Sequence, residues 1–202
     1  MNLFNTNATS ATVAAGTDAV DMDMATITVG GDTVGNSQLV DLVVSGDMAD
    51  VDMDDDLTNF TTLDVSAVAT NVVVDTSDAV FGASGGQFVE YQIGATSDGI
   101  DGTTDVDFTG NDDTREVYDF VGGDIGEVII DDFTVGADPS SGDRLDFSAF
   151  AASSGELVFE DDGGDLVITD LAGGLGDFGG SITIVGAGAD AADMASFNII
   201  YG

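Results

Sequence analysis

The side chains that could do chemistry in this sequence are almost all carboxylates. Of the 202 residues, 39 are Asp or Glu and only two, Arg115 and Arg144, are basic, so the formal net charge is −37. Histidine and cysteine are absent, which excludes histidine acid–base catalysis, thiol nucleophiles and zinc sites built from these residues. Crowded carboxylates repel one another unless a cation screens them, and Ca²⁺ prefers carboxylate and carbonyl oxygens. The composition therefore predicts several bound Ca²⁺ ions and no enzyme activity.

One group of candidate ligands lies around an acidic turn in residues 128–150. An apolar run at 128–130 and another at 145–150 predict two short strands, and the Gly, Asp, Pro and Ser residues between them predict a connecting loop. Such a loop offers both carboxylates and turn carbonyls to a Ca²⁺ ion. The predicted ligands, one of them just upstream of the turn, are Asp124, Asp131, Asp132, Asp138, Asp143 and Asp146.

A second group lies in residues 97–113, where carboxylates and glycines follow the spacing D-G-x-D-G-x-x-D-x-D. Glycine lets the backbone wrap closely enough for its carbonyls to coordinate an ion as well. The alternative is a glycine-rich surface loop whose charges are solvated. The predicted ligands are Asp98, Asp101, Asp105, Asp107, Asp112 and Asp113.

The densest acidic run, residues 47–56, is a third candidate. It lacks the glycine and the twelfth-position glutamate of an EF-hand loop. Three interpretations stay open: a solvated acidic loop, a Ca²⁺ site, or a contact between subunits closed by Ca²⁺. Apolar residues also alternate with Asp in this run, which is typical of a strand with one wet face. The predicted ligands are Asp50, Asp52, Asp54, Asp55 and Asp56.

The elements that must position these carboxylates are predicted to be short strands. Segments rich in β-branched and aromatic residues are separated by Gly, Asn and Asp, and only 187–195 indicates a short helix. The expected fold is all-β, either an elongated β-solenoid or β-sandwich-like modules with Asp/Gly-rich Ca²⁺-binding loops and little helix. The expected parts are an N-terminal segment at 1–16, a β-rich assembly domain at 17–127 and a β-rich C-terminal domain at 128–202. The predicted strands are 25–29, 39–44, 60–65, 71–75, 88–93, 117–121, 156–160, 165–169, 181–185 and 197–201.

The C-terminal part of the sequence resembles a class of exported proteins. The residues that carry the likeness are IIDDFTVGADPSSGDRLDFSAF at 129–150, GGDLVI at 163–168, SITIVG at 181–186 and ADMASFNII at 192–200. Their order is similar to the ending of RTX-like proteins exported by bacterial type I secretion. The Ca²⁺-binding nonapeptide of that family, GGxGxDxUx, does not appear intact, and GGDIGEV at 122–128 is its nearest relative. The resemblance implies an extracellular or cell-surface protein that uses the type I secretion machinery, and the absence of a Sec-like start agrees with that expectation.

These features together predict a structural role. We expect a secreted, Ca²⁺-dependent structural protein that assembles with itself into an extracellular filament or a surface layer. Two interpretations stay open for the segment 1–16, whose bulky residues are Leu3 and Phe4: a frayed terminus, or a segment that adds as a strand to a neighbouring subunit. The alternative is a Ca²⁺-dependent adhesin or biofilm-matrix protein that binds a glycan or a cell surface, and a halophile protein whose acids serve only for solvation ranks last. The negative charge argues against nucleic acid as a partner, and no apolar run reaches the length of about 18 residues that a membrane span needs.

Overall fold

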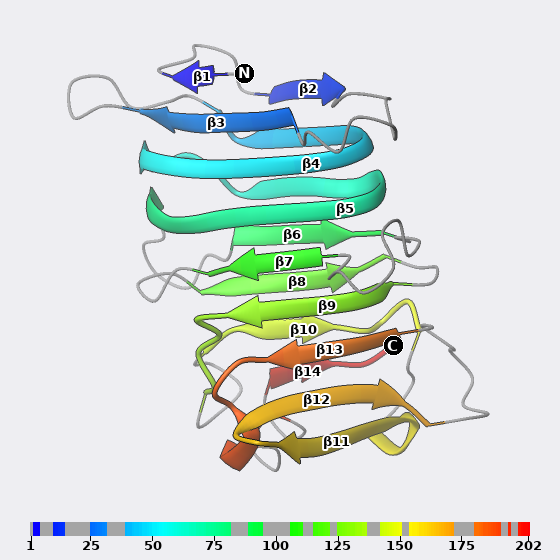
Figure 1. Ribbon diagram of the computed structural model, residues 1–202. Helices are drawn as coiled ribbons and strands as arrows, with labels where there is room; N and C mark the ends of the chain where they lie inside the picture. The colour runs from blue at the N-terminus through cyan, green and yellow to red at the C-terminus, as the bar shows by residue number, and fades with distance from the viewer. Residues whose placement is uncertain are drawn as a thin grey trace.

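The computed structural model of the chain is a stack of β-strands that lie across one long axis (Figure 1). The N-terminal strands form one end of the stack, and the β11–β12 hairpin from the C-terminal part forms the other. The structure describes residues 2–4, 10–14, 25–31, 39–81, 89–94, 106–110, 115–121, 125–136, 142–150, 154–171, 180–190, 194 and 198–202.

Strands make up most of the described residues, and the named helical elements among them are two short 3₁₀ turns. The first seven strands are β1 (Asn2–Phe4), β2 (Ser10–Ala14), β3 (Ala25–Gly31), β4 (Asp41–Leu57), β5 (Thr62–Phe81), β6 (Val89–Ile93) and β7 (Val106–Thr109). The elements that follow are β8 (Glu116–Phe120), β9 (Gly126–Asp131), β10 (Arg144–Asp146), η1 (Ser154–Glu156), β11 (Leu157–Asp162), β12 (Asp165–Asp170), β13 (Gly180–Ile184), η2 (Gly188–Asp190) and β14 (Ile199–Ile200).

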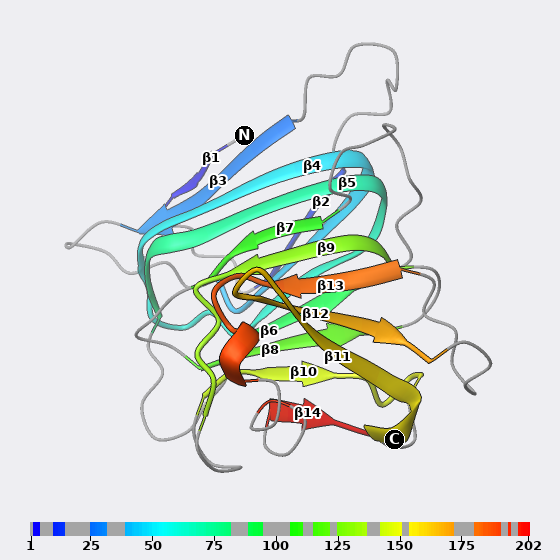
Figure 2. The same ribbon diagram turned by 60° about the horizontal axis from the view of Figure 1, so that its bottom comes forward.

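The strands form two mostly parallel faces that are joined through β4 and β5. The first face runs in the order β2–β4–β5–β6–β8–β10–β14, and the second in the order β1–β3–β4–β5–β7–β9–β13–β12–β11. Both faces share β4 and β5, which are 17 and 20 residues long and bend between them (Figure 2). In β5, residues 62–64 pair with β6 on the first face, and residues 72–75 pair with β7 on the second. Among the described strands, only the β11–β12 and β12–β13 pairs are antiparallel.

One apolar core lies between the two faces. Every second residue of β6 and β8 is buried, because successive side chains of a strand point to opposite sides. Rings from the two faces touch: the centroid of Tyr91 on β6 lies 5.3 Å from that of Phe108 on β7, which lies 5.5 Å from that of Tyr118 on β8. Burial of a large apolar side chain contributes about 1.5–3 kcal/mol. The packing of inward side chains therefore holds the two faces together.

The acidic run at 47–56 lies inside β4, so its interpretation as a loop is wrong and its interpretation as a strand with one wet face is confirmed. Val51 and Met53 are fully buried, and Asp50 and Asp52 alternate with them as half-buried residues. Parallel pairing with β3 on one side and β5 on the other satisfies the backbone of this segment. Backbone pairing and the alternation of side chains together let so acidic a segment form a strand.

The expected architecture, an elongated β-solenoid or β-sandwich-like modules, is wrong, whereas the β-rich character is confirmed. A β-sandwich would pair its strands antiparallel, but the strands of these two faces pair mostly in parallel. The sheet arrangement is in this respect Rossmann-like, although the described residues contain no α-helix. A regular solenoid repeats one structural unit, but here the β4–β5 register shifts at three places and the second face ends in an antiparallel meander. The error has a physical cause. Side-chain periodicity is the same in parallel and antiparallel strands, so the sequence pattern does not report how strands are connected.

Most predicted strands are present, with altered boundaries. Residues 62–65 of the segment predicted at 60–65 and the whole segment predicted at 71–75 belong to the single strand β5. The predicted hairpin at Gly163 and Gly164 is confirmed between β11 and β12, and both glycines have positive φ angles, 72° and 109°. Of the helix predicted at 187–195, the described part contains the 3₁₀ turn η2. None of the helices among the described residues is long and apolar enough to span a membrane.

Strand pairing continues across the expected boundary between residues 127 and 128. On the first face β8 pairs with β10, and on the second face β9 pairs with both β7 and β13. The apolar core contains residues from both sides of that boundary. The segments expected to be separate domains therefore share one core.

Candidate functional site

The predicted calcium ligands do not form a closed cage in the described part of the chain. No group of three or more carboxylates among the described residues could hold a metal ion. Only the backbones of Asp54, Asp55, Asp56 and Asp107 are described, within β4 and β7. The ligand assignment for the acidic loops stays a prediction. The predicted ligands that lie outside the described residues are Asp98, Asp101, Asp105, Asp112, Asp113, Asp124 and Asp138.

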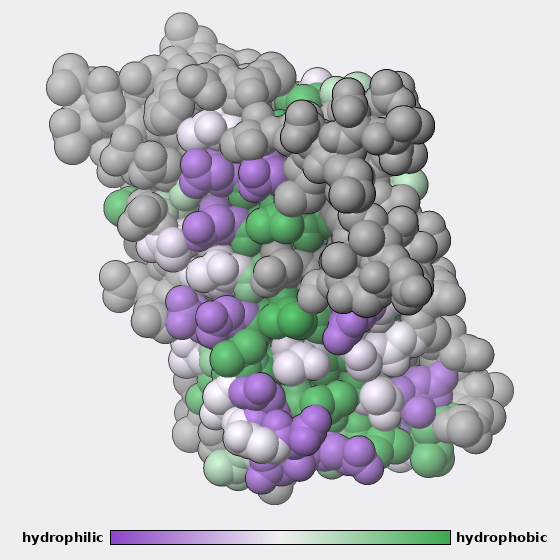
Figure 3. Space-filling model, viewed as in Figure 1, coloured by the Kyte–Doolittle hydropathy of each residue, from purple (hydrophilic) through white to green (hydrophobic). Residues whose placement is uncertain are grey.

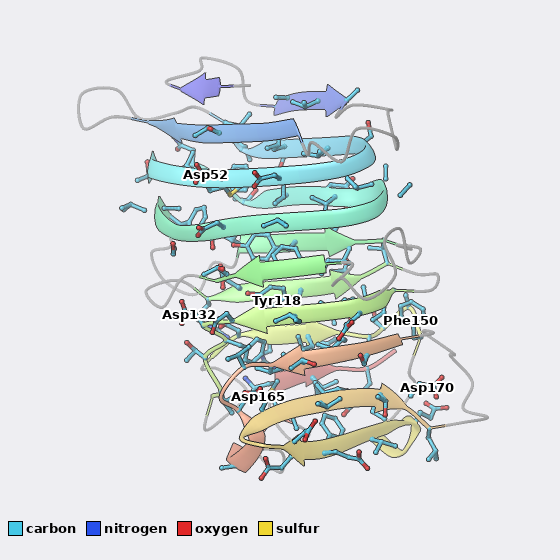
Figure 4. All side chains as sticks on the ribbon, viewed as in Figure 1. Asp52, Tyr118, Asp132, Phe150, Asp165 and Asp170 are labelled. Atoms are coloured by element: carbon cyan, nitrogen blue, oxygen red, sulfur yellow. The ribbon has the colours of Figure 1, made fainter. Side chains whose placement is uncertain are left out.

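The remaining predicted ligands are spread over several strands. Asp50 and Asp52 are half-buried on β4, whereas Asp131 and Asp132 are exposed at the end of β9. Figure 4 shows Asp52 and Asp132 at different heights of the stack. The backbone N–H of Asp132 donates to Oδ1 of Asp131 at 3.0 Å, and Asp132 has a left-handed φ of 60°. The two acidic segments are thus separate features of the surface.

Asp143 holds three segments of backbone together. Its side chain is fully buried, and its Oδ1 and Oδ2 accept hydrogen bonds from the backbone N–H groups of Glu116 at 2.9 Å and Thr134 at 2.7 Å. Its backbone carbonyl accepts a hydrogen bond from Nδ2 of Asn198 at 2.7 Å, and Oδ1 of Asn198 accepts one from the N–H of Gly136 at 3.3 Å. Because both carboxylate oxygens are engaged with backbone donors, the geometry gives Asp143 a structural role.

A second buried carboxylate, Glu116, lies in the core between the two faces. Its Oε1 accepts a hydrogen bond from the hydroxyl of Tyr91 at 2.5 Å, and its Oε2 accepts one from the hydroxyl of Tyr118 at 3.1 Å. The hydroxyl of Thr76, from the second-face part of β5, lies 3.5 Å from Oε1. A Cβ atom at Gly110 would lie 2.6 Å from Oε2, so a larger residue there would displace the carboxylate. Glu116 thus links side chains of both faces.

The two tyrosines keep their protons in this environment. Burial raises the pKa of Tyr91 and of Tyr118 well above its usual range, and the charge of Glu116 raises each pKa further. Both hydroxyls therefore remain hydrogen-bond donors to the carboxylate. Glu116 has no exposed surface, and its oxygens already accept these hydrogen bonds, so the cluster organises the core rather than presenting a reactive group.

On the outer side of the first face, carboxylates lie in register on neighbouring strands. Asp119 on β8 is aligned with Gln92 on β6 and with Asp146 on β10, and Gln92 is aligned with Asp64 on β5. Neighbouring strands lie about 4.8 Å apart, which brings like charges on adjacent strands close together. The pKa of Asp119 is raised from 3.8 to about 6, first by burial and then by the charges of Asp146 and Glu90. This part of the face is therefore destabilised by its own charge at neutral pH.

The variant Asp119→Asn should be more stable than the wild type at neutral pH, and the difference should shrink on acidification. A carboxyl group whose pKa is raised in the folded state binds its proton more tightly there. Its contribution to the free energy of unfolding is therefore most favourable below 3.8 and is lost as the pH rises through about 6. The gain for the variant at neutral pH should be about 1 kcal/mol, because partial solvation screens the repulsion.

Thermal unfolding followed at several pH values between about 4 and 8 tests this expectation. The control is Glu160→Gln, which removes one exposed carboxylate from β11. It should change stability less than Asp119→Asn does at neutral pH. An Asp119→Asn variant whose stability follows the same pH profile as the wild type would contradict the argument.

Sequence reasoning missed Glu116, Glu90 and Asp119. A strand was predicted at 117–121, and the observed strand begins one residue earlier, at Glu116. Extending the alternation of Tyr118 and Phe120 back by two residues places Glu116 on the buried side, so a signal for a buried carboxylate was present. The rows of outward acids gave no such signal, because they depend on which strands are neighbours.

Comparison of the chain with protein families, with characterised proteins and with solved structures finds no match.

Proposed function

We propose that this chain is a Ca²⁺-dependent structural protein that assembles with copies of itself outside the cell, into a filament or a surface layer. The observation that carries the proposal is the alignment of outward carboxylates on neighbouring strands of both faces. Such rows make the folded chain and its copies repel one another unless cations are present.

The second face carries a row of the same kind as the first. Asp52 on β4, Asp75 on β5, Thr109 on β7 and Asp131 on β9 follow one another in register. Figure 3 shows hydrophilic side chains at several heights of the stack, with hydrophobic side chains between them. Two unit charges 4 Å apart repel by about 1 kcal/mol in water, and by more where the groups are partly buried. Because these carboxylates repel one another, the stability of the folded subunit should depend on bound cations.

Divalent cations relieve repulsion both within a subunit and between subunits. Each Ca²⁺ ion cancels two negative charges, so about ten ions would remove more than half of the charge of −37. Extracellular sites with dissociation constants of about 10⁻⁴–10⁻³ M are common, so weak ligand sets suffice at the calcium level outside the cell. Under this proposal the chain assembles after export, and the type I secretion route is taken from the resemblance of residues 128–202.

Removing calcium should dissolve the assembly first and lower the melting temperature of the subunit second. Repulsion between highly charged copies acts over the whole contact, whereas the apolar core still holds each subunit together. Electron microscopy and calorimetry, each with and without excess chelator, measure the two effects. A parallel sample in sodium chloride of matched ionic strength separates calcium binding from general screening.

An assembly that survives chelation, with an unchanged melting temperature, would mean that the acids are only a solvated surface. A chain that stays monomeric in calcium but binds cells or glycans would instead support the alternative function, a Ca²⁺-dependent adhesin or matrix protein.

A further inference from the structure

The N-terminal end of the stack consists of edge strands. Among the described strands, β1 pairs only with β3, and β2 pairs only with β4. The strand β1, which contains Leu3 and Phe4, is therefore aligned with residues of its own chain, Val29 and Gly30. Among the described strands, both faces end here in short strands that are paired on one side (Figure 1).

This end differs in charge from the rest of the chain. The strands β1, β2 and β3 contain no charged side chain, and no Asp, Glu, Lys or Arg occurs in residues 1–17 of the sequence. On β2 the residues Ser10, Thr12 and Ala14 are exposed, and all three are small. In a chain of net charge −37, these strands therefore repel a second copy less than the acidic strands β4, β8 and β11 do.

At the opposite end of the stack, the last strand of the second face is protected against pairing. The last strand of the second face, β11, exposes Glu160, Asp161 and Asp162, and charged residues on an edge strand oppose the addition of a further strand. The turn η2 lies against the β11–β12 hairpin, where the N–H of Gly188 donates to the carbonyl of Gly164 at 2.8 Å. A head-to-tail contact would place the uncharged end against these carboxylates.

We propose that the N-terminal end of the stack, formed by β1 and β2, is an assembly interface and that its partner is the same end of a second copy. The inference builds on the proposed self-assembly and specifies one of its contacts. A two-fold axis perpendicular to the stack turns the N-terminal end of one copy toward that of the other, so that β1 faces β1 and β2 faces β2, each in antiparallel orientation. The interface is then isologous, and uncharged strands of the two copies face one another. Longer assemblies add a second, calcium-dependent contact elsewhere on the subunit.

A matched pair of charge variants tests the position of the interface. Ala14→Asp adds one negative charge to the N-terminal end, and Ala67→Asp adds the same charge at an exposed position of β5 in the middle of the stack. We expect Ala14→Asp to raise the protein concentration needed for half-maximal assembly about tenfold and Ala67→Asp to raise it less than about twofold. Sedimentation in millimolar calcium measures both, and circular dichroism verifies that both variants fold. Equal effects of the two variants would overturn the proposal, whereas a wild type that stays monomeric in calcium would contradict the proposed function itself.

Single cysteines test the symmetry of the contact, since the chain has no cysteine of its own. Thr12→Cys places a thiol at the middle of β2, and Glu160→Cys places one on β11 at the other end. With a short thiol cross-linker, Thr12→Cys alone should give covalent dimers, and Glu160→Cys alone should give none. Cross-linking that appears only when the two variants are mixed would show a head-to-tail contact and would overturn the inference. The inference would also be overturned if Thr12→Cys assembled as the wild type does but gave no cross-linked product.

Discussion

Replacing Asp143 with alanine is expected to lower the free energy of unfolding by about 3–4 kcal/mol. The side chain is fully buried, and its two oxygens accept the N–H groups of Glu116 and Thr134. Alanine would leave both donors without an acceptor in the protein interior, and each buried unsatisfied group costs about 1–3 kcal/mol. The loss should also loosen Glu116, whose carboxylate lies between Tyr91 and Tyr118. Urea unfolding followed by tyrosine fluorescence measures the change.

Two further variants at this place sharpen the test. Asp143→Asn keeps one acceptor oxygen but turns an amide donor toward the other backbone N–H, so its loss of stability should be intermediate. Asp146→Ala makes the same change as Asp143→Ala three residues later, on a half-buried side chain of β10 that accepts from the N–H of Ser148. It should cost less than about 1 kcal/mol, since removing its charge also relieves Asp119. Equal losses at 143 and 146 would contradict the structural role given to Asp143.

Replacing Gly94 with alanine is expected to cost about 3 kcal/mol or more. Gly94 follows β6 and is buried, and a Cβ atom there would lie 2.2 Å from the backbone carbonyl oxygen of Ser66 and 2.8 Å from its carbonyl carbon. Ser66 lies in β5 just beyond the residues that pair with β6, where the chain passes from the first face toward the second. Because the obstacle is backbone, relief requires the two strands to move apart.

The matched control is Gly186→Ala, the same substitution at a position where backbone conformation, and not a steric clash, opposes alanine. Gly186 is exposed, has a φ of 76° and has no atom within 4 Å of the position of a Cβ. Its cost should be only the left-handed backbone penalty of about 1–2 kcal/mol. Thermal unfolding of both variants compares the two effects. If Gly186→Ala lowered the free energy of unfolding as much as Gly94→Ala, the close approach of the two strands would not explain why position 94 requires glycine.

The proposed assembly should depend on the rigidity of the subunit. A subunit whose faces are fixed by buried polar contacts and by close strand approach presents its edge strands and its rows of acids in constant positions. We therefore expect variants that loosen Asp143 or Gly94 to assemble less well in calcium, even though neither residue lies at the N-terminal end. Ala14→Asp should also weaken assembly, but it should leave the melting temperature of the subunit close to that of the wild type.

The sequence by itself determined which side chains are available for chemistry. With no histidine and no cysteine, chemistry that needs those side chains is excluded, and a charge of −37 predicts cations as partners. Alternation of side chains predicted most of the strands and showed which residues face inward, as the Val51 and Met53 positions of β4 illustrate. These properties follow from composition and from contacts between near neighbours along the chain, so they can be read without knowing the fold.

Only the tertiary structure decided which acids lie together and which are buried. Glu116 meets Asp143 across 27 positions of sequence, and Asn198 meets Asp143 across 55. The alignment of Asp119 with Asp146 likewise depends on β8 and β10 being parallel neighbours. A strand's periodicity sets the side to which a residue points, but strand direction and neighbours depend on connections that have no local pattern. For that reason the strands could be predicted, while their parallel pairing, the hydrogen-bond partners of the buried carboxylates and the place of the uncharged strands at one end of the stack could not.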